Sequence, residues 1–73
     1  MITITDNPNG NQPYWEVVDS TGKLGKHIFD YDPKFQYGYD RVRVLRQIVD
    51  VYSILSGCKT QSWQIPGSVF ELL

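Results

Sequence analysis

Apolar residues recur with a helical period in one long stretch of the chain, residues 39–57. At about 100° per residue, its apolar and polar side chains separate onto opposite halves of a helical wheel. The apolar half holds Val44, Leu45, Ile48, Val49, Val51, Tyr52 and Leu55, and the polar half holds Arg43, Arg46, Gln47, Asp50 and Ser53. The pattern predicts an amphipathic helix with Asp40 as its N-cap and Gly57 as the residue that ends it.

Shorter stretches on both sides of this helix have the character of β-strands, because they alternate in polarity or are rich in β-branched and aromatic residues. They are residues 2–5, 14–18, 27–31, 62–65 and 69–73. Turn-forming residues separate them, including Asn9-Gly10 and Pro66-Gly67. The predicted element order is therefore β-β-β-α-β-β.

A sheet covered on one face by one helix is the simplest layered arrangement of these elements, and short connections predict hairpins. We therefore expect residues 1–73 to form a single small α+β domain, with a small antiparallel sheet packed on one amphipathic helix. The strands are two-sided, so the pattern leaves open which sheet face the helix covers. The expected core is Ile4, Trp15, Val17, Leu45, Ile48, Val49, Tyr52, Leu55, Trp63, Ile65 and Phe70.

The composition supports a folded chain and limits its surroundings. Of the 73 residues, 41% are hydrophobic and 14% aromatic, which is too apolar for a disordered chain. The net charge of −1 provides no general attraction to nucleic acid or to an anionic membrane. No secretory signal and no apolar run of about 20 residues is visible, so no membrane association is expected. Cys58 is the only cysteine, which favours a reducing compartment, the cytoplasm.

Residues able to bind a metal or a phosphate do not occur with the required spacing. One histidine and one cysteine cannot make a usual zinc site. The pair Asp30 and Asp32 resembles the start of a calcium loop, but Lys34 and Arg41 stand where oxygen ligands are needed. The Gly- and Lys-rich stretch 22–27 lacks the P-loop spacing. We expect neither a metal nor a cofactor.

Catalytic chemistry is also poorly supported. His27 could pair with Cys58 or with one of several serines, but no spacing indicates a base held against a nucleophile by a third group. We expect His27 to be a strand residue, and the chain to have no catalytic residues and not to be an enzyme.

Arg41, Arg43 and Arg46 crowd the beginning of the helix, where the helix dipole favours acidic residues. Two explanations are open. Nearby acids can neutralise the arginines, and the candidates are Asp30, Asp32, Asp40 and Asp50. Alternatively, a binding partner uses the arginines, because residues that break a local rule often serve function.

Tyrosine, tryptophan, phenylalanine and arginine are enriched at the centres of protein interfaces. Residues 31–46 concentrate tyrosine, phenylalanine and arginine. We therefore expect a small non-catalytic interaction module, an adaptor or a steric inhibitor of a larger protein. A phage-type inhibitor fits the size. The expected partner-binding residues are Tyr37, Tyr39, Arg43 and Arg46.

The alternative function is a regulatory protein that binds nucleic acid. It needs the tip of the hairpin at residues 19–26 to lie near the start of the helix, so that Lys23, Lys26, Arg41, Arg43 and Arg46 form one basic patch. Bases could then stack on Tyr14, Tyr31, Tyr37 and Tyr39. Self-association is a separate hypothesis, in which the end strands 2–5 and 69–73 pair between copies to form a homodimer.

Overall fold

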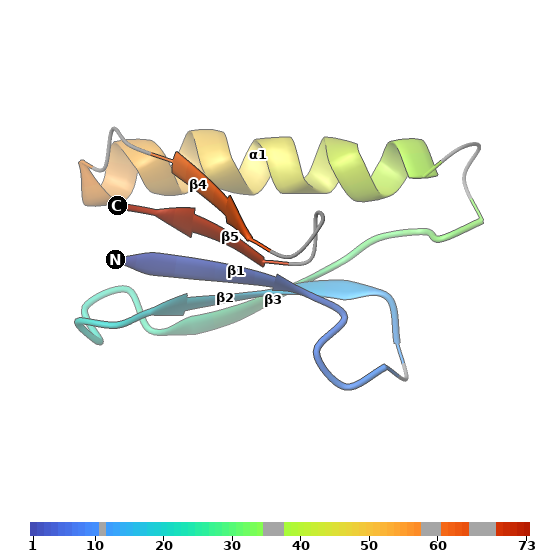
Figure 1. Cartoon of the computed structure of the whole chain (residues 1–73), viewed down its shortest axis with the longest axis horizontal. Helices are drawn as coiled ribbons and strands as arrows, with labels where there is room; N and C mark the ends of the chain where they lie inside the picture. Colours follow the sequence, from blue (N-terminus) through green and yellow to red (C-terminus); the bar gives the residue numbers. More distant parts are fainter. Residues whose placement is uncertain (11, 35–37, 58–60, 65–68) are drawn as a thin grey trace.

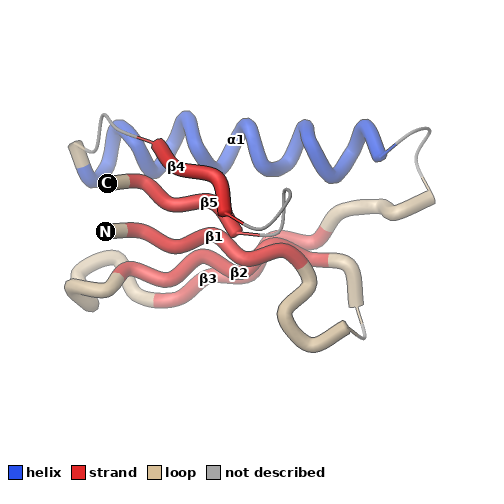
Figure 2. The backbone as a smooth tube through the Cα atoms, viewed as in Figure 1, coloured by secondary structure: helices blue, strands red, loops and turns tan. Residues whose placement is uncertain are grey.

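A computed structural model describes residues 1–10, 12–34, 38–57, 61–64 and 69–73. Along the chain, its elements are β1 (Ile2–Asp6), β2 (Tyr14–Asp19), β3 (Lys26–Asp30), α1 (Tyr39–Ser56), β4 (Gln61–Gln64) and β5 (Val69–Leu72). The strands form one antiparallel sheet in the order β3-β2-β1-β5-β4, and α1 lies along one face of it (Figures 1 and 2). The predicted α+β class and element order are confirmed.

The central strand β1 determines which side chains face the helix. Ile4 lies opposite Val17 of β2 on one side and opposite Phe70 of β5 on the other. Because side chains alternate between the two faces of a strand, this register gives each of the three strands two large apolar residues on the face beneath α1. The buried core joins Ile2, Ile4, Trp15, Val17, Phe70 and Leu72 of the sheet to Val44, Leu45, Ile48 and Tyr52 of the helix.

The buried stripe of the helix is narrower than the sequence pattern predicted. Leu55 was expected in the core, but it is 59% exposed, and Val51 is 51% exposed. An 18-residue helix is about 27 Å long, whereas a strand of five residues spans only about 17 Å. The helix is therefore longer than the strands that support it, and Leu55 in its last turn lies beside Met1 and Ile2, where β1 begins.

Other core residues differ from the expectation in smaller ways. Val49 is only partly buried, and Ile2, Val44 and Leu72 join the core without having been predicted there. Tyr14 is buried on the opposite sheet face, where Asn9 Nδ2 donates a hydrogen bond to its hydroxyl at 2.9 Å. The side chain of Trp63 and residue Ile65 lie outside the part of the chain that the structure describes.

The two ends of α1 test the capping predictions. Asp40 is not the N-cap, because the helix begins at Tyr39 after Gly38, whose φ of 70° needs the left-handed conformation that glycine tolerates. The prediction for Gly57 is confirmed, since its φ is 72° and its amide donates to the carbonyl oxygen of Ser53 at 3.0 Å.

The predicted pairing of the end strands between copies is wrong. β1 pairs with β2 and β5 within the chain, and β5 pairs with β1 and β4. Both edges of these strands are therefore occupied. The edges of the sheet are β3 and β4.

Candidate functional site

The outward face of α1 brings three of the four predicted partner-binding residues together. Tyr39, Arg43 and Arg46 follow one another at intervals of four and three residues, which places them on one side of a helix. With Val42 and Gln47 they line a shallow hollow of about 330 Å³. These five residues are called the α1 patch below. Tyr37, the fourth predicted residue, lies outside the described residues.

The apolar members of the α1 patch are open to solvent. Tyr39 is 61% exposed and Val42 is 55% exposed. An exposed aromatic ring beside an exposed aliphatic side chain is a suitable contact surface, because both lose water readily when a partner covers them. The patch can therefore offer apolar area and two guanidinium groups side by side.

An acid within the chain holds one of the two patch arginines in place. Arg43 donates from both Nε and Nη2 to Oδ1 of Asp40, with an Nε–Oδ1 distance of 2.9 Å. Oδ2 of Asp40 accepts the backbone amide of Asp32 at 2.7 Å. These bonds, first that from Asp32 and then those from Arg43, lower the pKa of Asp40 below its ordinary value. The edge of the Arg43 guanidinium that carries Nε and Nη2 is thus fixed in position.

Arg46 differs from Arg43 because it makes no ion pair with any residue that the structure describes. Its side chain lies between the hollow of the α1 patch and a second hollow lined by Arg41, Leu45 and Phe70. Four acids were predicted to neutralise the arginines. Among the ion pairs of the described residues, only Asp40 does so, and its partner is Arg43.

Arg41 does not belong to the patch. Its Nε donates to Oδ2 of Asp6 at 2.7 Å, and its guanidinium lies 4.9 Å from the centre of the Trp15 ring. The hydroxyl of Tyr31 donates to Oδ1 of the same Asp6 at 2.6 Å, and Trp15 Nε1 donates to the carbonyl oxygen of Arg41 at 3.0 Å. Burial and the bond to Asp6 raise the pKa of Tyr31 to about 12. Sequence reasoning missed Asp6, since no local pattern links it to Arg41.

The single basic patch required for nucleic-acid binding does not form. The hairpin that carries Lys23 lies beside Leu55 and Ser56 at the end of α1, whereas Arg43 lies near its start (Figure 1). Lys26 pairs with Glu16 at 3.4 Å. Tyr14 is buried, and the ring of Tyr31 packs against the core with its centre 6.2 Å from that of Trp15, so neither ring is open for a base to stack on.

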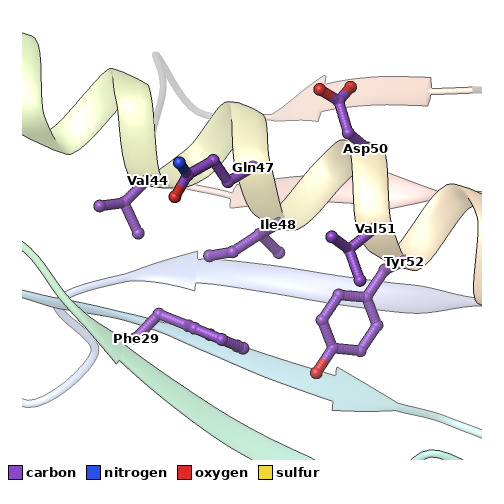
Figure 3. Close-up of a pocket in the computed structure, with 7 residues that line it drawn as sticks. All are labelled: Phe29, Val44, Gln47, Ile48, Asp50, Val51 and Tyr52. Carbon is purple, nitrogen blue, oxygen red and sulfur yellow. The ribbon is translucent and has the colours of Figure 1, made fainter.

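A third hollow, of about 510 Å³, lies between α1 and the edge strand β3. Figure 3 shows Phe29 pointing from β3 toward Ile48 and Tyr52 of the helix. The rings of Phe29 and Tyr52 meet edge to face, with centres 6.2 Å apart. Val44 and Val51 complete the apolar wall, and Gln47 and Asp50 stand at its rim.

His27 lies beside this hollow as a strand residue. Its Nε2 is 2.8 Å from the carbonyl oxygen of Leu24, and its ring centre is 6.3 Å from that of Tyr52. Cys58 lies outside the described residues. Within the described ranges, no three histidine, cysteine, aspartate or glutamate side chains gather in a way that could hold a metal ion. Nor does any helix found there have the length and apolar character needed to cross a bilayer.

Comparison of the chain with protein-family models, with curated proteins and with solved structures found no match.

Proposed function

We propose that this chain is a small non-catalytic interaction module that acts as an adaptor or steric inhibitor by placing the α1 patch against a larger protein. The observation that carries the proposal is the grouping of exposed Tyr39 and Val42 with Arg43 and Arg46 around one hollow. Tyrosine and arginine are the residue types that most often dominate the binding energy of an interface.

The two arginines would act differently. Arg43 is already oriented by Asp40, so little conformational entropy is lost when a partner's acidic or carbonyl group meets its free edge. Arg46 has no ion pair among the described residues and can take a carboxylate from a partner directly. The preferred partner surface is therefore an acidic rim around an apolar centre that covers Val42 and the Tyr39 ring.

Inhibition would be steric, because the chain offers bulk rather than chemistry. A helix that lies flat on a partner's surface blocks whatever that surface normally binds. The size alone suggests an inhibitor of the phage type. The single cysteine supports action in the cytoplasm, where thiols stay reduced.

The test is capture of partners from a lysate of the native cells by the tagged chain, with and without nuclease, read by mass spectrometry. The variant Arg43→Ala/Arg46→Ala should lose the captured protein, and with the purified partner its dissociation constant should rise by about tenfold or more. The control variant Lys23→Ala/Lys34→Ala removes the same charge from exposed residues outside the patch. It should bind as the parent does.

Two outcomes would contradict the proposal. Equal binding by both double variants would show that the α1 patch is not the interface. Loss of the captured proteins on nuclease treatment, with nucleic acid recovered instead, would replace the proposal with the nucleic-acid alternative.

A further inference from the structure

The edge strand β3 presents an unpaired row of backbone groups. The amide of Asp19 donates to the carbonyl oxygen of Gly25 at 3.1 Å, and the amide of Tyr31 donates to that of Pro13 at 3.2 Å. Residues 25 and 31 therefore direct their backbone groups toward β2. Since this direction alternates along a strand, the N–H and C=O groups of Lys26, Ile28 and Asp30 point away from the sheet.

Two of the devices that commonly block an edge strand, a bulge and a proline, are missing from β3. Its register with β2 runs without interruption from Tyr14 opposite Asp30 to Val18 opposite Lys26, so the strand has no bulge. It contains no proline. Within the described residues, no other strand lies against its outer edge. Such an edge can accept a further strand.

The charges on β3 are arranged symmetrically about its central residue. Lys26 stands two residues before Ile28, and Asp30 stands two residues after it. The Lys26 side chain is 62% exposed, and Asp30 is also exposed. Asp30 makes no ion pair with any described residue of its own chain. The strand is therefore complementary in charge to an antiparallel copy of itself.

We propose that two copies of this chain join through β3, antiparallel and about a two-fold axis at Ile28, into one continuous sheet. In this register Lys26 lies opposite the partner's Asp30 and Asp30 lies opposite the partner's Lys26. Each facing pair, including Ile28 with the partner's Ile28, then exchanges both of its backbone hydrogen bonds. The interface is isologous, as closed two-fold symmetry requires.

Side chains on both faces of the joined sheet fit this register. On the face away from α1, Ile28 is 56% exposed and would meet the partner's Ile28. Lys26 would lie between Glu16 of its own chain, 3.4 Å away, and the partner's Asp30. On the helix face, His27 would lie opposite the partner's Phe29 in a non-hydrogen-bonded pair, where side chains are closest.

The hollow between α1 and β3 also favours a second copy as the occupant. Its apolar wall of Phe29, Ile48, Val51 and Tyr52 borders the open side of β3 (Figure 3). The two-fold axis would bring the two hollows face to face, so that each copy covers apolar surface of the other. This burial adds to the backbone bonds, which alone contribute little net free energy in water.

Charge variants test the proposal together with its register. Sedimentation equilibrium of the parent at several concentrations should show a monomer–dimer equilibrium. Lys26→Asp places a carboxylate opposite the partner's Asp30, and Asp30→Lys places two ammonium groups opposite each other, so each single change should raise the dissociation constant by about tenfold. The double variant Lys26→Asp/Asp30→Lys should restore dimers. An equimolar mixture of the two single variants should form the mixed dimer.

A backbone variant tests the strand pairing itself. Ile28→Pro removes an N–H that points away from β2, so the hairpin of β2 and β3 keeps its backbone hydrogen bonds. The joined sheet loses two hydrogen bonds between the copies, one from the N–H of each Ile28. This variant should be monomeric, and Ile28→Thr, which keeps the N–H, should remain dimeric. Circular dichroism confirms folding in each case. A parent that stays monomeric at every concentration overturns the proposal, as does a dimer that is unaffected by the charge and proline changes.

Discussion

The Nε atom of Arg41 donates to Oδ2 of Asp6 at 2.7 Å, and this ion pair joins residues that lie 35 positions apart in the chain. The second oxygen of Asp6 accepts the Tyr31 hydroxyl, and the Arg41 carbonyl accepts the Trp15 indole N–H. The first turn of α1 is thereby tied to β1, to β2 and to the residue that follows β3. Because Arg43 and Arg46 follow on the same rigid helix, this cluster also fixes the position of the α1 patch.

Loss of the Arg41–Asp6 pair should weaken the fold. The Arg41 and Asp6 side chains are only 31% and 17% exposed, so Arg41→Ala leaves a shielded carboxylate without its cation. Hydrogen bonds to charged groups contribute about 1.5–3 kcal/mol, and urea denaturation should show a loss of this size. Arg43→Ala breaks a solvent-exposed pair instead and should cost clearly less than Arg41→Ala. Equal losses from the two variants would contradict this role for Arg41.

The raised pKa of Tyr31 predicts a loss of stability in alkali. The folded state holds this phenol proton up to a pKa of about 12, whereas the unfolded chain releases it near the ordinary tyrosine pKa of 10.0. The folded state therefore binds more protons in this window, and the free energy of unfolding falls as pH rises through it. Tyr31→Phe should make that decline shallower without removing it, because burial also raises the pKa of Tyr52. Identical slopes for parent and variant would argue against this coupling.

Arg43 contributes to the lowered pKa of Asp40, but the backbone amide of Asp32 contributes more. Arg43→Ala should therefore move the pKa of Asp40 part of the way back toward its ordinary value and leave it still lowered. Titration of the Asp40 carboxyl by nuclear magnetic resonance measures this directly. A full return to the ordinary value would mean that the Asp32 bond does not persist in solution. Arg46→Ala, which removes a cation that does not touch Asp40, serves as the control.

Two leucines of α1 offer a matched test of which helix face is buried. Leu45 is 4% exposed and Leu55 is 59% exposed, although both lie on the apolar half of the helical wheel. Leu45→Ala should cost about 2–5 kcal/mol through lost burial and a cavity, enough to unfold much of a domain this small. Leu55→Ala should change stability by about 0.5 kcal/mol or less. Thermal denaturation of both variants checks the difference, and similar midpoints would place Leu55 in the core after all.

The features that local pattern decides were predictable. The period of α1 identified the helix and placed Arg43 and Arg46 together on its polar half, because residues at such spacing must share a face. Alternation identified the strands, and Gly57 ended the helix as its lack of a side chain allows.

The features that depend on distant parts of the chain were not predictable. No local signal shows that Asp6 would meet Arg41, or that β1 would lie between β2 and β5 and leave β3 at an edge. The helical wheel also does not show which residues of its apolar half the sheet covers, so the exposure of Leu55 was not predictable. The distance from the hairpin tip to the start of α1 likewise follows from the fold as a whole, and it separated Lys23 from the arginines.

The position of β1 between β2 and β5 has a consequence for how the chain folds. β2 can pair with β1 across a short connection, but Ile4 meets Phe70 only when almost the whole chain has closed into one loop. The entropy of loop closure is lost before the contacts of β5 with β1 return any free energy, and such distant contacts slow folding. On a ribosome, the first three strands and the helix would have to wait for β5, so the middle of the sheet would stay incomplete until β5 had been synthesised.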